Sequence, residues 1–94
     1  MLIIAGWLDV EPADRDGYLA DCVPVLQQAA TAPGCLDFVL SADPLLPGRI
    51  RVFERWESDG DLTRFRGAGP DTGQAARILG ADVHKYRISA VEPP

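Results

Sequence analysis

The sequence predicts an α+β domain whose four strands form one antiparallel sheet, with helices on one face of that sheet. Two observations support this. Four short segments have the alternating or continuous apolar pattern of strands, and the segments between them have helical spacing, in the order βαββαβ. Glycine and proline residues separate these segments. The order is typical of the ferredoxin-like, split βαβ arrangement.

Length and composition predict a single domain over residues 1–94. A chain of 94 residues is long enough for one hydrophobic core and too short for two. The net charge of -5 argues against a nucleic-acid partner, because binding phosphates requires clustered Lys and Arg. No apolar run approaches the ~20 residues that span a membrane. The N-terminus lacks the basic start of a signal peptide, so we expect a cytoplasmic protein.

The first strand is expected from Leu2 to Asp9, and apolar residues on both of its faces predict a central place in the sheet. Asp14 and Asp16 favour the start of a helix, where backbone N–H groups attract negative charge. Pro24 should kink this helix, because it lacks a backbone donor. The apolar stripe of the helix consists of Leu19, Cys22, Val23, Leu26 and Ala30.

The second and third strands are expected to form a hairpin. Cys35 to Ser41 is the second strand, with Leu36, Phe38 and Leu40 pointing inward, and the loop of residues 43–48 reverses the chain. The third strand runs from Arg49 to Glu57. One of its faces carries Ile50, Val52, Glu54 and Trp56.

Ser58 and Asp61 have the spacing of a capping box, which predicts a helix over residues 59–66 that presents Leu62 and Phe65. A second short helix is expected over residues 71–79. The fourth strand is expected from Asp82 to Val91. The more apolar of its two faces carries His84, Tyr86, Ile88 and Ala90.

The sheet face away from the helices carries Trp7, Val39 and Phe53 among charged side chains. Such a mixed face is not typical of a fully solvated sheet. We therefore expect a second sheet to pack on it in a face-to-face homodimer.

The segment Phe53-Glu-Arg-Trp-Glu-Ser58, with Gly34-Cys-Leu-Asp-Phe38 before it and Leu62 after it, resembles the antibiotic biosynthesis monooxygenase (ABM) family. The resemblance implies a dimeric α+β barrel. Several members oxidise polyketide phenols or quinols without a cofactor, and Trp56 matches the tryptophan that lines their pocket. Val52 and Leu62 stand where one branch has polar residues. Trp7 stands where haem-degrading relatives have Asn, and Phe65 stands where many members have His.

If the apolar faces of the third and fourth strands both point toward the helices, Trp56, Glu54, His84 and Tyr86 converge on one cavity. Phe38 and Phe65 would form its walls. We expect His84 as the catalytic base and Trp56 as a stacking platform for a small aromatic substrate that reacts with molecular oxygen. The residues expected to bind the substrate are Trp56, Glu54, Tyr86, Phe38 and Phe65.

Other interpretations stay open at this point. His84 and Trp56 are also compatible with a structural role in the core, and Glu54 with an arginine partner. His84 and Glu54 are too few for a metal site, so neither a metal nor another cofactor is expected. The protein is then either a cofactor-independent monooxygenase or a non-catalytic ligand-binding or accessory dimer.

Overall fold

The computed structural model describes residues 1–67 and 75–94. It contains one four-stranded antiparallel sheet in the order β2-β3-β1-β4. The strands are β1 (Leu2–Asp9), β2 (Cys35–Ala42), β3 (Arg49–Trp56) and β4 (Gly80–Arg87), and the helices are η1 (Pro12–Asp14), α1 (Arg15–Asp21), α2 (Val23–Ala30) and α3 (Asp59–Arg66). The ferredoxin-like α+β fold is therefore confirmed, with β1 central as expected.

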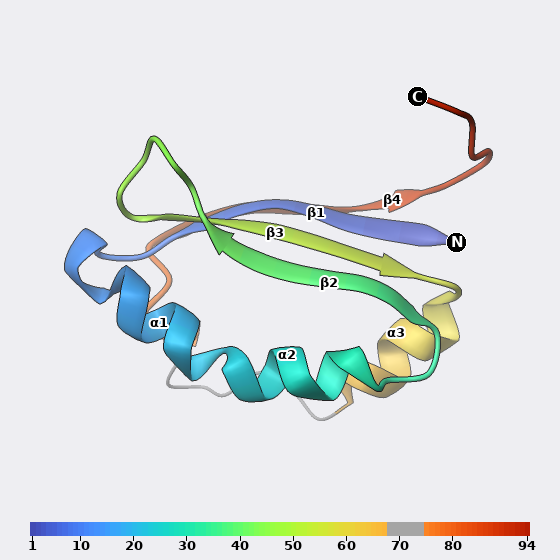
Figure 1. Ribbon diagram of the computed structural model, residues 1–94, viewed down its shortest axis with the longest axis horizontal. Helices are drawn as coiled ribbons and strands as arrows, with labels where there is room; N and C mark the ends of the chain where they lie inside the picture. Colours follow the sequence, from blue (N-terminus) through green and yellow to red (C-terminus); the bar gives the residue numbers. More distant parts are fainter. Residues whose placement is uncertain (68–74) are drawn as a thin grey trace.

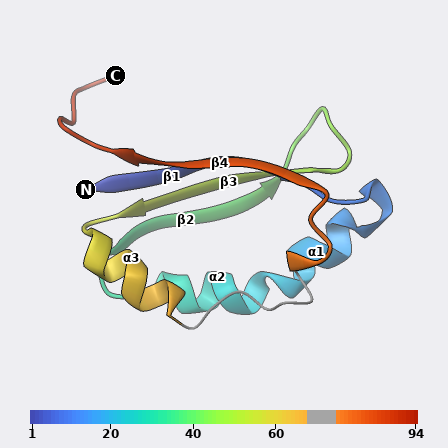
Figure 2. The same cartoon turned by 180° about the vertical axis from the view of Figure 1, so that it is seen from behind.

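The helices lie on one side of the sheet and leave the other side open (Figures 1 and 2). The expected interruption near Pro24 is present, since α1 ends at Asp21 and α2 begins at Val23. Pro24 occupies the first turn of α2, where a backbone N–H has no intrahelical acceptor. The capping of α3 is also confirmed, because the Ser58 hydroxyl accepts a hydrogen bond from the Asp61 N–H at 3.2 Å.

The core between sheet and helices has two clusters. One contains Leu2, Ile4, Trp56 and Leu62, and lies near α3. The other lies near α1 and contains Val10, Tyr18, Cys22 and Ile50. Cys22 and Cys35 form no disulfide with each other.

Three expected features differ in the structure. A bulge between Cys35 and Asp37 leaves Leu36 37% exposed, so this side chain does not point inward. β4 begins at Gly80 and ends at Arg87, whereas the sequence predicted residues 82–91. Of the helix expected over residues 71–79, residues 71–74 lie outside the described residues, and residues 76–79 form a turn and irregular structure instead.

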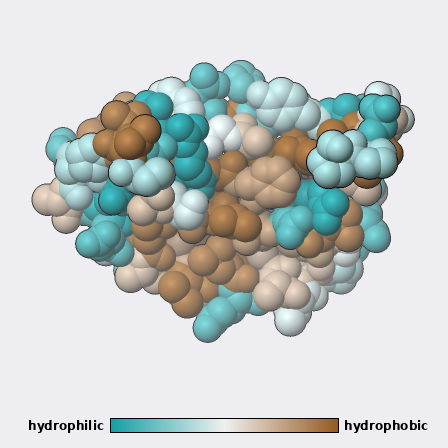
Figure 3. Space-filling model, turned by 45° about the horizontal axis from the view of Figure 1, so that its top comes forward, coloured by the Kyte–Doolittle hydropathy of each residue, from teal (hydrophilic) through white to brown (hydrophobic). Residues whose placement is uncertain are grey.

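The open face of the sheet carries apolar side chains that the protein itself does not cover. Val39 and Phe53 are directly paired on β2 and β3, and they are 47% and 37% exposed. Tyr86 on β4 is 52% exposed. Figure 3, in which the top of Figure 1 is turned forward, shows apolar groups exposed across the middle of the molecule.

Candidate functional site

The end of β3 holds a buried hydrogen-bonded pair on the sheet face that the helices cover. The Trp56 indole Nε1 donates to Glu54 Oε1 at 3.0 Å. Trp56 is 0% exposed and Glu54 is 8% exposed. Residues i and i+2 of a strand point to the same face, so the two side chains leave the strand side by side. The pair thus places a carboxylate beside the apolar cluster near α3.

Two phenylalanine rings complete this group. The ring centroids of Trp56 and Phe65 are 5.2 Å apart, and those of Phe65 and Phe38 are 5.6 Å apart. Both separations are typical of attractive aromatic pairs. Phe38 lies opposite Glu54 on β2, and Phe65 comes from α3. Phe38 and Phe65 are half-buried, so they keep surface that Trp56 has lost. The structure brings together four of the predicted site residues: Trp56, Glu54, Phe38 and Phe65.

Burial raises the pKa of Glu54 above its usual value, while the hydrogen bond from Trp56 and the positive charge of Arg66 oppose this shift. Burial likewise raises the pKa of the nearby Cys35 thiol, and the charge of Glu54 adds to it. A carboxylate with a raised pKa is a stronger base than an exposed one. Glu54 therefore has the environment of a proton acceptor.

The prediction that His84 and Tyr86 share a cavity with Trp56 is wrong. His84 pairs with Ala5 and Tyr86 pairs with Ile3, whereas Trp56 pairs with Leu2. Since directly paired residues of antiparallel strands point to the same face, and neighbours along a strand to opposite faces, His84 and Tyr86 lie on the open face. The inward residue of β4 in this region is Val83, which packs against the core.

On the open face, His84 has a local partner of its own. Its Nε2 lies 2.6 Å from Asp82 Oδ1, and the two side chains are 66% and 55% exposed. The centroids of the His84 and Tyr86 rings are 6.4 Å apart. His84 is thus separated by the sheet from Glu54 and Trp56.

The expected stacking role of Trp56 also changes. A ring that is 0% exposed offers no face to a ligand in this structure. Its indole N–H instead orients the Glu54 carboxylate. The strand spacing of the two residues was visible in the sequence, but the direction of the indole N–H depends on how Leu62 and Phe65 pack around the ring.

In residues 1–67 and 75–94, no group of three or more His, Cys, Asp or Glu side chains could hold a metal ion. Within the same part of the chain, no helix is long and apolar enough to cross a membrane.

The model of the antibiotic biosynthesis monooxygenase (ABM) family matches residues 1–71 of this chain. The chain belongs to this family. The matched residues include β1, both strands of the hairpin and α3, and therefore the whole Glu54–Trp56 pair. Comparison with curated proteins gives no match.

Solved structures share the ABM fold at low sequence identity. A protein from Deinococcus radiodurans, described as a candidate antibiotic biosynthesis monooxygenase, is 18% identical, with a TM-score of 0.85 over 100% of this chain and 98% of that chain. A protein of the same description from Nitrosomonas europaea is 13% identical, with a TM-score of 0.82 over 96% of this chain and 100% of the other.

A third such protein, from Caulobacter crescentus, is 21% identical, with a TM-score of 0.79 over 97% of this chain and 90% of that chain. At identities this low, the likeness demonstrates the fold. ABM membership together with this fold supports a role of the monooxygenase type, while the substrate has to be argued from the site.

Proposed function

We propose that this ABM protein is a cofactor-independent monooxygenase that oxidises a small aromatic phenol or quinol with molecular oxygen. The observation that carries the proposal is the buried hydrogen bond between Glu54 and Trp56, 3.0 Å long, beside two half-buried aromatic rings. An apolar site with one oriented acceptor suits a flat substrate with one acidic hydroxyl.

In this mechanism Glu54 removes the phenolic proton, and Trp56 is a positioning residue that holds the carboxylate. The phenolate, which is richer in electrons than the phenol, reduces oxygen. One oxygen atom enters the substrate at a C–H position as a carbonyl, and the other leaves as water, so the substrate supplies all the electrons. The raised pKa of Glu54 favours proton transfer. Phe38 and Phe65 pack against the substrate ring.

Oxygen consumption with a panel of substituted hydroquinones tests this proposal. Glu54→Gln keeps the shape and an acceptor for Trp56 but removes the base, and we expect the rate to fall by roughly 10²–10⁴-fold. The matched control is Glu57→Gln, which removes an exposed carboxylate three residues away and should keep the wild-type rate. Equal rates for wild-type protein and Glu54→Gln would show that Glu54 is not the base.

A non-catalytic role is the second candidate, and the complete burial of Trp56 favours it. A tryptophan whose N–H is satisfied by a neighbouring carboxylate is also a good core residue. In that case wild-type protein consumes no oxygen above the uncatalysed rate with any hydroquinone. In a ligand-binding module, the NMR signal of the Trp56 indole N–H would still shift on addition of an aromatic ligand. In a purely structural dimer it would not.

We propose that the protein is a homodimer whose subunits pack through their open sheet faces. Val39, Phe53 and Tyr86 supply exposed apolar surface there, and two such faces stacked about 10 Å apart would bury them. A mass near 10.2 kDa in sedimentation equilibrium at micromolar concentration would contradict the dimer. A cytoplasmic location, expected from the sequence, belongs to the same proposal.

A further inference from the structure

A pocket of about 250 Å³ lies between α2 and the start of β2. β2 is an edge strand of the sheet, and the bulge after Cys35 leaves Leu36 without a partner in β3. Apolar cavities of about 150 Å³ are known to bind benzene. The pocket is therefore large enough for at least one aromatic ring.

The pocket shares a wall with the Glu54–Trp56 pair. Cys35 and Phe38 line the pocket, and both also pack against the core cluster that contains Trp56. Cys35 is paired with Trp56 across the two strands, and Phe38 is paired with Glu54. Neighbouring strands lie about 5 Å apart. A ligand in the pocket is thus separated from the pair by a single layer of side chains.

Phe38 is the part of this wall that can move. Glu54 is 8% exposed, so a substrate reaches its carboxylate only if a neighbouring side chain turns away. Phe38 is half-buried, with Phe65 on one side, at 5.6 Å between ring centroids, and the pocket on the other. A change of its side-chain rotamer would open Glu54 to the pocket and leave the fully buried Trp56 in place.

The charges around the pocket favour an uncharged ligand. Asp37 lies at its edge, with its carboxylate 3.0 Å from Arg55 Nη2, and Arg66 acts on Glu54 from α3 without lining the pocket. None of the described lining residues is basic, so an anionic ligand would gain no partner in the pocket and would approach two carboxylates. The remaining lining residues are Leu26, Ala29, Ala30 and Leu36.

From these contacts we propose that the substrate binds in the α2–β2 pocket as an uncharged phenol, with its hydroxyl pointing past a displaced Phe38 toward Glu54. The role of the hydroxyl rests on the proposed monooxygenase function, whereas the position of the ring does not. α2 lies on the covered side of the sheet (Figure 1), so a second copy stacked on the open face leaves the pocket accessible.

The test is a titration of ¹⁵N-labelled wild-type protein with 4-methylphenol, a neutral phenol. The chain contains two tryptophans, and Trp7→Phe identifies the indole N–H signal of Trp56. We expect this signal to shift along a saturating curve, because the ligand binds beside the pair. No shift at any ligand concentration overturns the site.

Alkylation of Cys35 by N-ethylmaleimide reports on the pocket itself. Cys35 lines it, whereas Cys22 is 4% exposed, and Cys35→Ser confirms which thiol carries the label. At a 4-methylphenol concentration of about four times Kd, labelling should slow about fivefold, since about one fifth of the pockets are then empty. An unchanged labelling rate overturns the position of the ligand.

Two alanines provide matched variants. Ala30 and Ala20 are both exposed helix residues, but Ala30 lines the pocket and Ala20 does not. Leucine is a good helix former, so both variants should fold. Ala30→Leu fills part of the pocket and should raise the Kd by about five- to tenfold, while Ala20→Leu should leave it unchanged. A wild-type Kd for Ala30→Leu overturns the pocket.

The anionic analogue 4-hydroxybenzoate tests the charge argument. It should bind at least about fivefold more weakly than 4-methylphenol, and equal or tighter binding overturns the preference for an uncharged ligand. These measurements need no turnover, so the two proposals fail separately. Binding of 4-methylphenol in the pocket without oxygen consumption in the hydroquinone panel supports the pocket and contradicts the monooxygenase. Wild-type oxygen consumption by Ala30→Leu, with an unchanged Kd, does the reverse.

Discussion

Trp56 and Glu54 lie two residues apart on β3, and the indole N–H of the first donates to the carboxylate of the second at 3.0 Å inside the core. This contact turns a buried carboxylate, which is costly in an apolar interior, into an oriented acceptor. It also determines which site residues act together. Glu54 belongs with Trp56, Phe38 and Phe65, while His84 belongs to the other face of the sheet.

The first prediction concerns stability and pH. Because the pKa of Glu54 is raised in the folded protein above its usual value of 4.5, the folded state binds more protons than the unfolded state just above pH 4.5. Its contribution to stability is therefore present at low pH and lost as pH rises through the folded pKa. We expect the difference in unfolding free energy, wild type minus Glu54→Gln, to fall as pH rises above 4.5.

Urea unfolding at closely spaced pH values measures this difference. Glu57→Gln controls for the loss of one negative charge, since Glu57 is exposed. A difference that rises with pH would mean that the folded state favours the ionised form of Glu54.

The second prediction reverses the role that the sequence indicated for His84. The imidazole is on the open face and 66% exposed, paired with Asp82, so it cannot reach a substrate bound at Glu54. His84→Ala should leave kcat/KM for hydroquinone oxidation within about twofold of wild type. A loss near that of Glu54→Gln, in a variant with the wild-type oligomeric state, would restore His84 as the base.

The third prediction concerns the open face. Phe53→Asp places a charge opposite Val39 in the middle of that face, and burying it in a dimer would cost several kcal/mol. Sedimentation equilibrium should then show a monomer. The control is Val23→Asp on α2, where a side chain of similar exposure (44%) points away from the open face. A dimer that survives Phe53→Asp would have to form through another surface.

The fourth prediction concerns Gly6 in β1. Its φ is 150°, and an added Cβ would lie 1.9 Å from the backbone oxygen of Asp82, so β1 and β4 would have to separate. Gly6→Ala should destabilise the protein by about 2–4 kcal/mol in urea unfolding. Gly80→Ala is the control in β4, because nothing lies within 4 Å of its added Cβ. It should change stability by less than about 0.5 kcal/mol.

Most of the fold could be predicted because its signals are local. The inward face of β3 was correct, since alternation along one strand depends only on that strand. The error in β4 has a different origin. Tyr86 and Ile88 make the face of β4 that points away from the helices look apolar in the sequence. The sequence has no signal for which strand face meets the helices. The pairing of β4 with β1 decides which face of β4 meets the helices.

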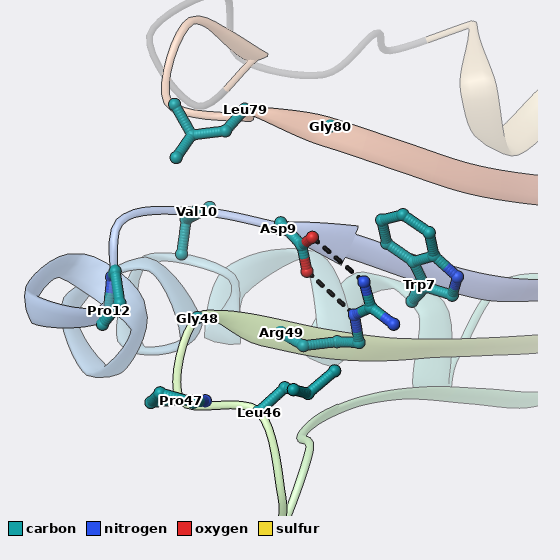
Figure 4. A pocket seen from close by; sticks show the side chains of 10 residues that line it. All are labelled: Trp7, Asp9, Val10, Pro12, Leu46, Pro47, Gly48, Arg49, Leu79 and Gly80. Carbon is teal, nitrogen blue, oxygen red and sulfur yellow. Dashed lines mark hydrogen bonds and ion pairs between the residues drawn. The ribbon is translucent and has the colours of Figure 1, made fainter.

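The aromatic part of the candidate site could also be predicted from the sequence. Phe38 and Phe65 were expected beside Trp56, because helix and strand periodicity point them into one core. A pocket lined by Trp7 and Arg49, at the end of the sheet where β1 ends (Figure 4), was not expected. Its lining comes from the ends of three strands and the loops next to them, and the spacing along the chain does not show that these segments meet.

The amino-acid sequence alone determined the order of the elements, the break before Pro24, the cap at Ser58 and the buried face of β3, because each depends on neighbours a few residues away. The tertiary structure decided that His84 faces away from Trp56, that the indole N–H reaches Glu54, and that Arg49 stacks on Trp7. These contacts depend on strand register and core packing, and a shift of one residue in register would reverse every side chain of the strand.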